Sequence, residues 1–299
     1  MSSRRPFKSS IDYVSLGNRL RAYRLGAGMQ ADEVARKLEV SRAVVYRMEK
    51  GEIVKIEMLE RVAHMLDTSL ASLLGVEIEY YSNAIGLFER MRQLEQKSDR
   101  IFAHFEPVSL LLTTDNYLEH MRLMLLEASP GDAGPVLKEK EVDELIRLIA
   151  ERKATFEQRK PHLISLVGLR ELERFLHVGL VGRMDLPART RKARQKAARA
   201  EVEHMAELME SEPLHVQIGL VDETMPASTF QAFTMGRKKA VAVSPFRLGE
   251  LPNVRNGIAT VTESSQALRM YENLISRLWR QAHRGKSGAR RLRQLLAET

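Results

Sequence analysis

Cysteine is absent from this 299-residue chain, which excludes disulfides, thiol nucleophiles and thiolate metal ligands. Histidine and carboxylate zinc sites remain chemically possible, but the eight histidines are scattered and show no HExxH spacing. The sequence therefore predicts no metal site and no cofactor.

Motifs that carry catalysis are missing as well. The chain has no glycine-rich phosphate-binding loop and no GxSxG turn that would present a nucleophilic serine. Exposed carboxylates on a predicted helix are more simply explained by solvation. We do not expect an enzyme.

Long hydrophobic runs are also lacking. The longest candidates, such as 108–112, are far too short to span a bilayer. The first residues, MSSRRPFKSS, are basic but have no apolar segment behind them, so they do not read as a signal peptide. We expect a flexible basic arm over 1–11, no membrane association and a cytoplasmic location.

What the chain does have is an excess of basic residues. Its net charge is +8, which suits an anionic partner. Residues 1–75 carry 13 basic and 9 acidic residues, whereas the remaining 224 carry 34 and 30. The excess is four in each part, so it is about three times denser in the first quarter, where nucleic-acid binding is expected.

That first quarter reads as five short helices. Apolar residues recur at helical spacing, and Ser41 and Gly51 are typical start and stop residues around the third segment. The pattern predicts a compact all-α domain over 12–76, with helices at 13–25, 30–38, 41–50, 56–66 and 69–74.

The segment GMQADEVARKLEVSRAVVYRMEKGE, followed by LERVAHMLDTSLASLLG, resembles the helix-turn-helix of the Cro and phage-repressor (XRE) family. The resemblance covers about the first 75 residues. It implies that the third helix enters the DNA major groove with its exposed N-terminal face toward the bases. By this resemblance, the base-contacting residues are Arg42, Ala43 and Arg47. The residues better placed for DNA phosphates are Gln30, Ser41 and Tyr46.

Two positions depart from the family pattern. Ala31 stands where the family usually has a phosphate-contacting Gln, and Glu39 stands where it favours Gly in the turn between the helices. The second departure implies a non-glycine residue in a left-handed or adjusted turn. The alternative to DNA binding is a helical bundle used for protein contact. An uncompensated pair of arginines, Arg42 and Arg47, favours DNA.

The rest of the chain predicts a larger α+β domain with helices and a small sheet. Helical patterns cover FERMRQLEQKSDRIF, YLEHMRLMLLE, 138–158, 189–209 and 265–283. Short β-branched runs such as LISLVG, HVQIGLV, STFQAFTM, KAVAVS and GIATVT predict strands. The predicted divisions are a helical linker or start of the second domain at 77–135, a regulatory or dimerisation domain at 136–283 and a basic C-terminal tail at 284–299. The basic run 189–199 reads as a solvated helix face rather than an auxiliary nucleic-acid contact.

This larger part weakly resembles the domain of unknown function that follows an XRE-type helix-turn-helix in many bacterial regulators. Such a domain is expected to sense a signal or mediate assembly. Ser244 and Arg247, in the loop SPFRLGELPN, form a possible effector loop that could hold a carboxylate. The alternative is a plain surface loop in which Arg247 pairs with a local Glu.

Together these features predict a multidomain, sequence-specific transcription regulator that binds double-stranded DNA. It would act as a homodimer on a palindromic site, with a small-molecule effector as a further possible partner. The alternative is an antitoxin-like or adaptor protein whose second domain holds a partner protein.

Overall fold

The computed structural model describes residues 12–52, 55–75, 78–105, 107–128 and 138–299; the predicted arm at 1–11 and the boundary at 135–136 lie outside them. The N-terminal unit is all-helical, and each of its five predicted helices is confirmed to within one residue at either end. They are α1 (Tyr13–Gly26), α2 (Ala31–Leu38), α3 (Arg42–Glu49), α4 (Ile56–Met65) and α5 (Leu70–Leu74).

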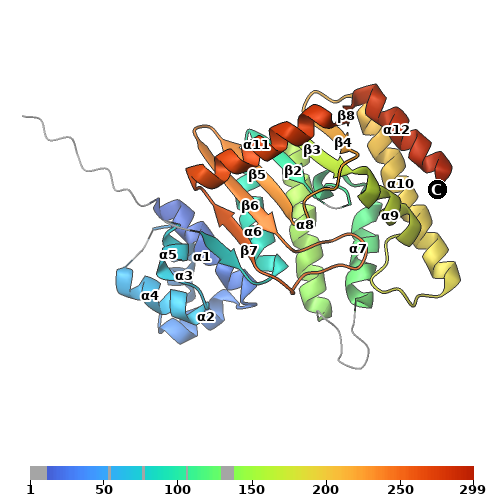
Figure 1. Cartoon of the computed structure of the whole chain (residues 1–299). Coiled ribbons are helices and arrows are strands. Elements are labelled where there is room, and N and C mark those ends of the chain that lie inside the picture. The colour runs from blue at the N-terminus through green and yellow to red at the C-terminus, as the bar shows by residue number, and fades with distance from the viewer. Residues whose placement is uncertain (1–11, 53–54, 76–77, 106, 129–137) are drawn as a thin grey trace, which may run out of the picture.

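A mixed eight-stranded sheet forms the centre of the larger unit (Figure 1). Its spatial order is β1-β7-β6-β5-β2-β3-β4-β8, with β2, β3 and β4 parallel and the other neighbours antiparallel. The strands are β1 (Glu79–Tyr81), β2 (Arg100–His104), β3 (His162–Gly168), β4 (Val216–Val221), β5 (Thr229–Met235), β6 (Lys238–Ser244), β7 (Ala259–Thr262) and β8 (His283–Arg284).

Helices cover both faces of this sheet. On one face Glu79 of β1 binds Arg90 of α6, whereas Phe230, on the opposite face, contacts the ring of Tyr271 in α11. Parallel strands need long crossovers, which α7–α8 and α9–α10 provide. The helices are α6 (Ala84–Glu95), η1 (Leu110–Leu112), α7 (Asn116–Glu127), α8 (Glu139–Arg159), α9 (Leu169–Val178), α10 (Ala188–Ser211), α11 (Ser265–Gln281) and α12 (Gly285–Glu298).

The helix predicted to run through FERMRQLEQKSDRIF is wrong in its second half. The helix α6 ends at Glu95, and 100–104 form β2 in the middle of the sheet. Helical periodicity continues into this segment, but β2 pairs on both sides, with β3 and β5. Tertiary pairing overrides the local pattern here.

The expected α+β class is confirmed, but the sheet is larger than predicted because β1, β2 and β8 were not foreseen. The segment 77–135 contributes two of these strands, β1 and β2. The basic C-terminal segment is also more structured than a tail. It forms α12, which packs on α10 and buries Ala289, Leu292 and Leu296.

The two units meet through a buried, partly charged junction. The rings of Tyr23 in α1 and Tyr81 in β1 stack at 4.9 Å. Glu79 accepts two hydrogen bonds from Arg90 at 2.8 and 2.9 Å and lies 3.7 Å from Arg19 of α1. All three charged side chains are almost completely buried. The N-terminal unit is therefore packed against the sheet.

Candidate nucleic-acid interface

The sequence around α3 fixes both ends of this helix. The Ser41 hydroxyl accepts a hydrogen bond from the Val44 amide at 3.4 Å, which caps the N-terminus. Gly51 follows the helix with φ of 77°, and a Cβ there would lie 2.3 Å from the carbonyl oxygen of Tyr13. Only glycine suits this position. Val45 and Met48 are buried, as predicted, and turn the opposite face of α3 outward.

The turn between α2 and α3 has the expected strained residue. Glu39 adopts φ of 58° and ψ of 41°, which is the left-handed conformation that glycine accepts more readily. Ala31 is 4% exposed, so this position offers no side chain to a DNA phosphate. Gln30, the residue before it, is exposed and makes no side-chain cap to α2.

A buried ion pair ties α1 to the end of α3. Arg24 Nε lies 2.5 Å from Glu49 Oε1, and Arg24 Nη2 donates to Glu49 Oε2 at 3.3 Å. A third donor, Nη1, binds the carbonyl oxygen of Met29 at 2.9 Å. This network fixes the position of α3 and of the entry to α2 relative to α1.

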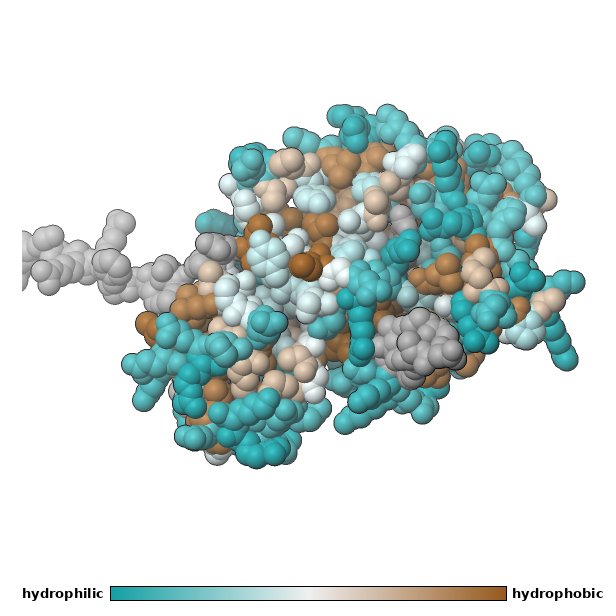
Figure 2. Space-filling view, turned by 60° about the horizontal axis from the view of Figure 1, so that its bottom comes forward, coloured by the Kyte–Doolittle hydropathy of each residue, from teal (hydrophilic) through white to brown (hydrophobic). Residues whose placement is uncertain are grey.

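The outward face of α3 carries the three predicted base-contacting residues. Arg42, Ala43 and Arg47 are all exposed. Ala43 lies one turn before Arg47, and Arg42 lies one turn before Tyr46, so these residues form the outward face of α3. Tyr46 is 38% exposed and lies on the same side. Figure 2 shows hydrophilic side chains over most of the lower-left lobe, which the N-terminal unit forms.

The prediction that Arg42 and Arg47 have no acidic partners is wrong. Arg42 lies 3.2 Å from Asp32 and donates to the Tyr46 hydroxyl at 2.9 Å, while Arg47 lies 3.3 Å from Glu52. All of these carboxylates are exposed, and such surface pairs stabilise a fold by only about 0–1 kcal/mol. Both guanidinium groups can therefore exchange their partners for DNA at small cost.

The predicted phosphate-contacting residues occupy two places. Gln30 precedes α2 and Ser41 precedes α3, whereas Tyr46 lies one turn into α3. Ser41 has its hydroxyl oxygen engaged in the cap, but the hydroxyl proton can still be donated. Amide groups at a helix N-terminus favour an anion, so Gln30 and Ser41 suit phosphate better than Tyr46 does on position alone.

The predicted effector loop is less open than expected. Ser244 is 3% exposed, and its hydroxyl accepts the Phe246 amide at 2.9 Å. Arg247 is half-buried and forms a backbone bridge with Asn253. The nearby Glu250 pairs with Arg174 at 2.7 Å rather than with Arg247. Neither the open loop nor the local Arg–Glu pair describes this segment.

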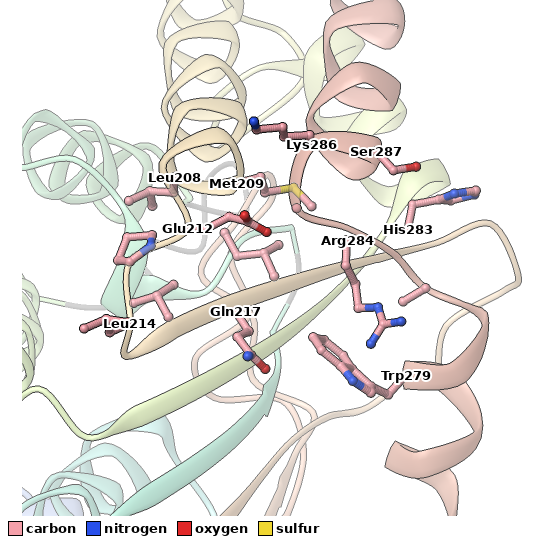
Figure 3. Close-up of a pocket in the computed structure, with 15 residues that line it drawn as sticks. Leu208, Met209, Glu212, Leu214, Gln217, Trp279, His283, Arg284, Lys286 and Ser287 are labelled. Atoms are coloured by element: carbon pink, nitrogen blue, oxygen red, sulfur yellow. The ribbon is translucent and has the colours of Figure 1, made fainter.

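A cavity lies at the edge of the sheet that β4 and β8 form. It has a volume of about 1000 Å³ and is bounded by the end of α10, β4, the end of α11 and the start of α12. Figure 3 shows Arg284 extending toward Trp279, and its guanidinium carbon lies 5.1 Å from the ring centroid. Glu212 and Lys286 add charges of opposite sign to the wall. No motif in the sequence predicts this cavity, which is lined by side chains from several separate segments.

No role was predicted for Arg24 or Glu49, although their positions in the sequence indicate that both side chains are buried. Arg24 lies four residues after Leu20, and Glu49 lies four residues after Val45, so each continues a buried stripe. A charged residue on such a stripe implies a buried partner. The pairing itself needs the fold.

Across the ranges that the structure describes, no group of three His, Asp or Glu side chains is arranged to hold a metal ion. In the same ranges, no helix combines the length and apolar character needed to cross a membrane.

Helix-turn-helix domains place their second helix in the major groove of DNA, and the arrangement of α2 and α3 has this form. Residues 15–74 match the model of a helix-turn-helix domain family, which is about a fifth of the chain. The N-terminal unit is therefore a helix-turn-helix domain. No curated protein matches the chain.

Among solved structures, the chain is similar to the apo form of the competence regulator ComR from Streptococcus vestibularis. The identity is 16%, the match covers 65% of this chain and 50% of that chain, and the TM-score is 0.20. The chain thus spans half the length of that structure. A likeness of this size carries no argument about fold or function.

Proposed function

We propose that the protein is a sequence-specific DNA-binding transcription regulator that inserts α3 into the major groove. The observation that carries the proposal is the exposed face of α3 in a helix-turn-helix domain, where Arg42, Ala43 and Arg47 lie together. A guanidinium group can bind guanine through two hydrogen bonds, which discriminates by about 1–3 kcal/mol. Gln30, Ser41 and Tyr46 would orient the domain on phosphates.

The test is selection of duplexes from a random pool by the full chain, followed by binding of the selected duplex to Arg42→Ala/Arg47→Ala. We expect the double variant to lose sequence-specific binding with unchanged helical content. Arg147→Ala, an exposed arginine of α8, is the matched control and should bind as the parent does. Unchanged specific binding by the double variant would refute the assignment of α3.

We further propose a homodimer, because paired helix-turn-helix domains read palindromic sites. The larger unit would form the dimer, sense an effector or do both. The cavity beside Trp279 supports an effector, since small-molecule sites typically have volumes of about 300–1000 Å³. Mass measurement of the purified chain, alone and with cell extract, separates this proposal from an adaptor. A stable dimer favours a regulator, and stoichiometric capture of a different protein favours an adaptor.

A further inference from the structure

A second cleft lies between the helix-turn-helix domain and the larger unit. It has a volume of about 300 Å³. Tyr46 and Lys50, at the end of α3, line one side of the cleft. Gln96 and Lys97, at the end of α6, line the other side. Side chains from the larger unit therefore lie directly beside the helix that we propose enters the DNA groove.

The acidic residues of this cleft are already neutralised. Glu89 is 1% exposed and binds Arg21 at 3.0 Å and Arg92 at 2.8 Å. Burial raises the pKa of Glu89, but the hydrogen bonds and charge of Arg92, together with Gln93 and Arg21, leave the pKa below its usual range. Glu49 is held by Arg24.

The lysines of the cleft are not neutralised. Lys50 and Lys97 are both exposed, and neither forms an ion pair with an acid of the described residues. Arg21 and Arg92 both bind Glu89, and Arg92 also lies 4.0 Å from Glu151, so the positive excess of the cleft rests on Lys50 and Lys97. A lysine ammonium group on a flexible stem suits an exposed phosphate, because it needs no fixed geometry.

We propose that Lys97 of the larger unit, together with Lys50, binds backbone phosphates of DNA beside the site read by α3. This inference rests on the proposed function and deepens it. The DNA footprint then extends beyond the helix-turn-helix domain, and the larger unit takes part in binding directly. The contribution is independent of sequence, since phosphate contacts position a protein without reading bases.

The experiment measures how the affinity of the full chain for its selected duplex changes with KCl concentration. Each phosphate contact contributes about 0.9 to the slope of log K against log salt. We expect Lys97→Gln to reduce the magnitude of the slope by about 0.9. The affinity of the variant relative to that of the parent should then be about eightfold lower at 0.1 M than at 1 M salt. Lys50→Gln should act similarly, and the double variant should lower the slope by about 1.8.

The matched control is Lys192→Gln, which removes an exposed lysine of α10. This helix lies at the opposite end of the molecule from the N-terminal unit (Figure 1). We expect its slope to equal that of the parent, so that net charge alone is not the cause. A parental slope for Lys97→Gln, or an equal fall for Lys192→Gln, would overturn the inference while the proposed function stands. Failure of the parent chain to select any duplex would instead overturn the proposed function, and this inference with it.

Discussion

The ion pair between Arg24 and Glu49 allows a quantitative test of how α3 is held. Their side chains are 6% and 4% exposed, so Glu49→Gln leaves a buried guanidinium group without a counter-charge. Breaking a buried pair in this way costs about 3–5 kcal/mol. The matched control is Glu52→Gln, which breaks the exposed pair with Arg47 in the same region and should cost about 0–1 kcal/mol. Arg24→Met/Glu49→Leu should recover most of the loss, because apolar side chains need no counter-charge.

The assay is urea unfolding of the full chain, followed by far-ultraviolet circular dichroism and by tryptophan fluorescence. Trp279 is the single tryptophan and lies in the larger unit, so its fluorescence reports that unit alone. We expect Glu49→Gln to shift an early circular-dichroism transition to lower urea and to leave the fluorescence transition nearly in place. A loss for Glu49→Gln no greater than that for Glu52→Gln would refute the reasoning. So would an Arg24→Met/Glu49→Leu variant that is less stable than Glu49→Gln.

Gly51→Ala should lower thermal stability more than Gly236→Ala, because both glycines have positive φ but only a Cβ at 51 meets backbone, at 2.3 Å; equal losses would contradict this. Burial lowers the pKa of His104 below 6.5, although its contacts with carbonyl oxygens oppose the shift. The stability that the neutral side chain adds is therefore complete above pH 6.5, and it is lost as the pH falls through the pKa of the folded state. Unfolding free energy measured from pH 7 to 5 should therefore fall less for His104→Gln than for the parent, with a difference in slope of at most about 1.4 kcal/mol per pH unit. Glu79→Gln should cost about 3–5 kcal/mol and make the junction between the units more accessible to protease; unchanged proteolysis would argue against a charged junction.

The helix-turn-helix domain could be predicted because its signals are local. Capping residues, glycine stops and apolar periodicity all lie within the segments that they define, and Ser41 and Gly51 act as their residue types suggest. The exposed positions of Arg42 and Arg47 follow from the same periodicity. Their partners Asp32 and Glu52 do not, since the orientation of two long side chains depends on the packed geometry.

The sheet could be predicted only in part, because pairing between strands is not local. The β2 segment RIFAH follows a helical pattern and is recognisable as a strand only beside β3 and β5, which begin more than 60 residues later in the chain. The two-residue β8 is too short to have a pattern of its own. The clefts were unpredictable for the same reason: Lys50 and Lys97 are 47 positions apart in the sequence and meet only through the packing of α1 on α6.

The junction has a consequence for DNA recognition by a dimer. A helix-turn-helix domain on a flexible tether can adjust to different distances between half-sites, but this domain is packed against β1 and α6. The stack of Tyr23 on Tyr81 and the contact of Arg19 with Glu79 would have to break before the domain could reorient. In a homodimer formed by the larger unit, the distance between the two recognition helices would therefore be set by that unit. A ligand that changed the dimer geometry would act on DNA binding without touching α3.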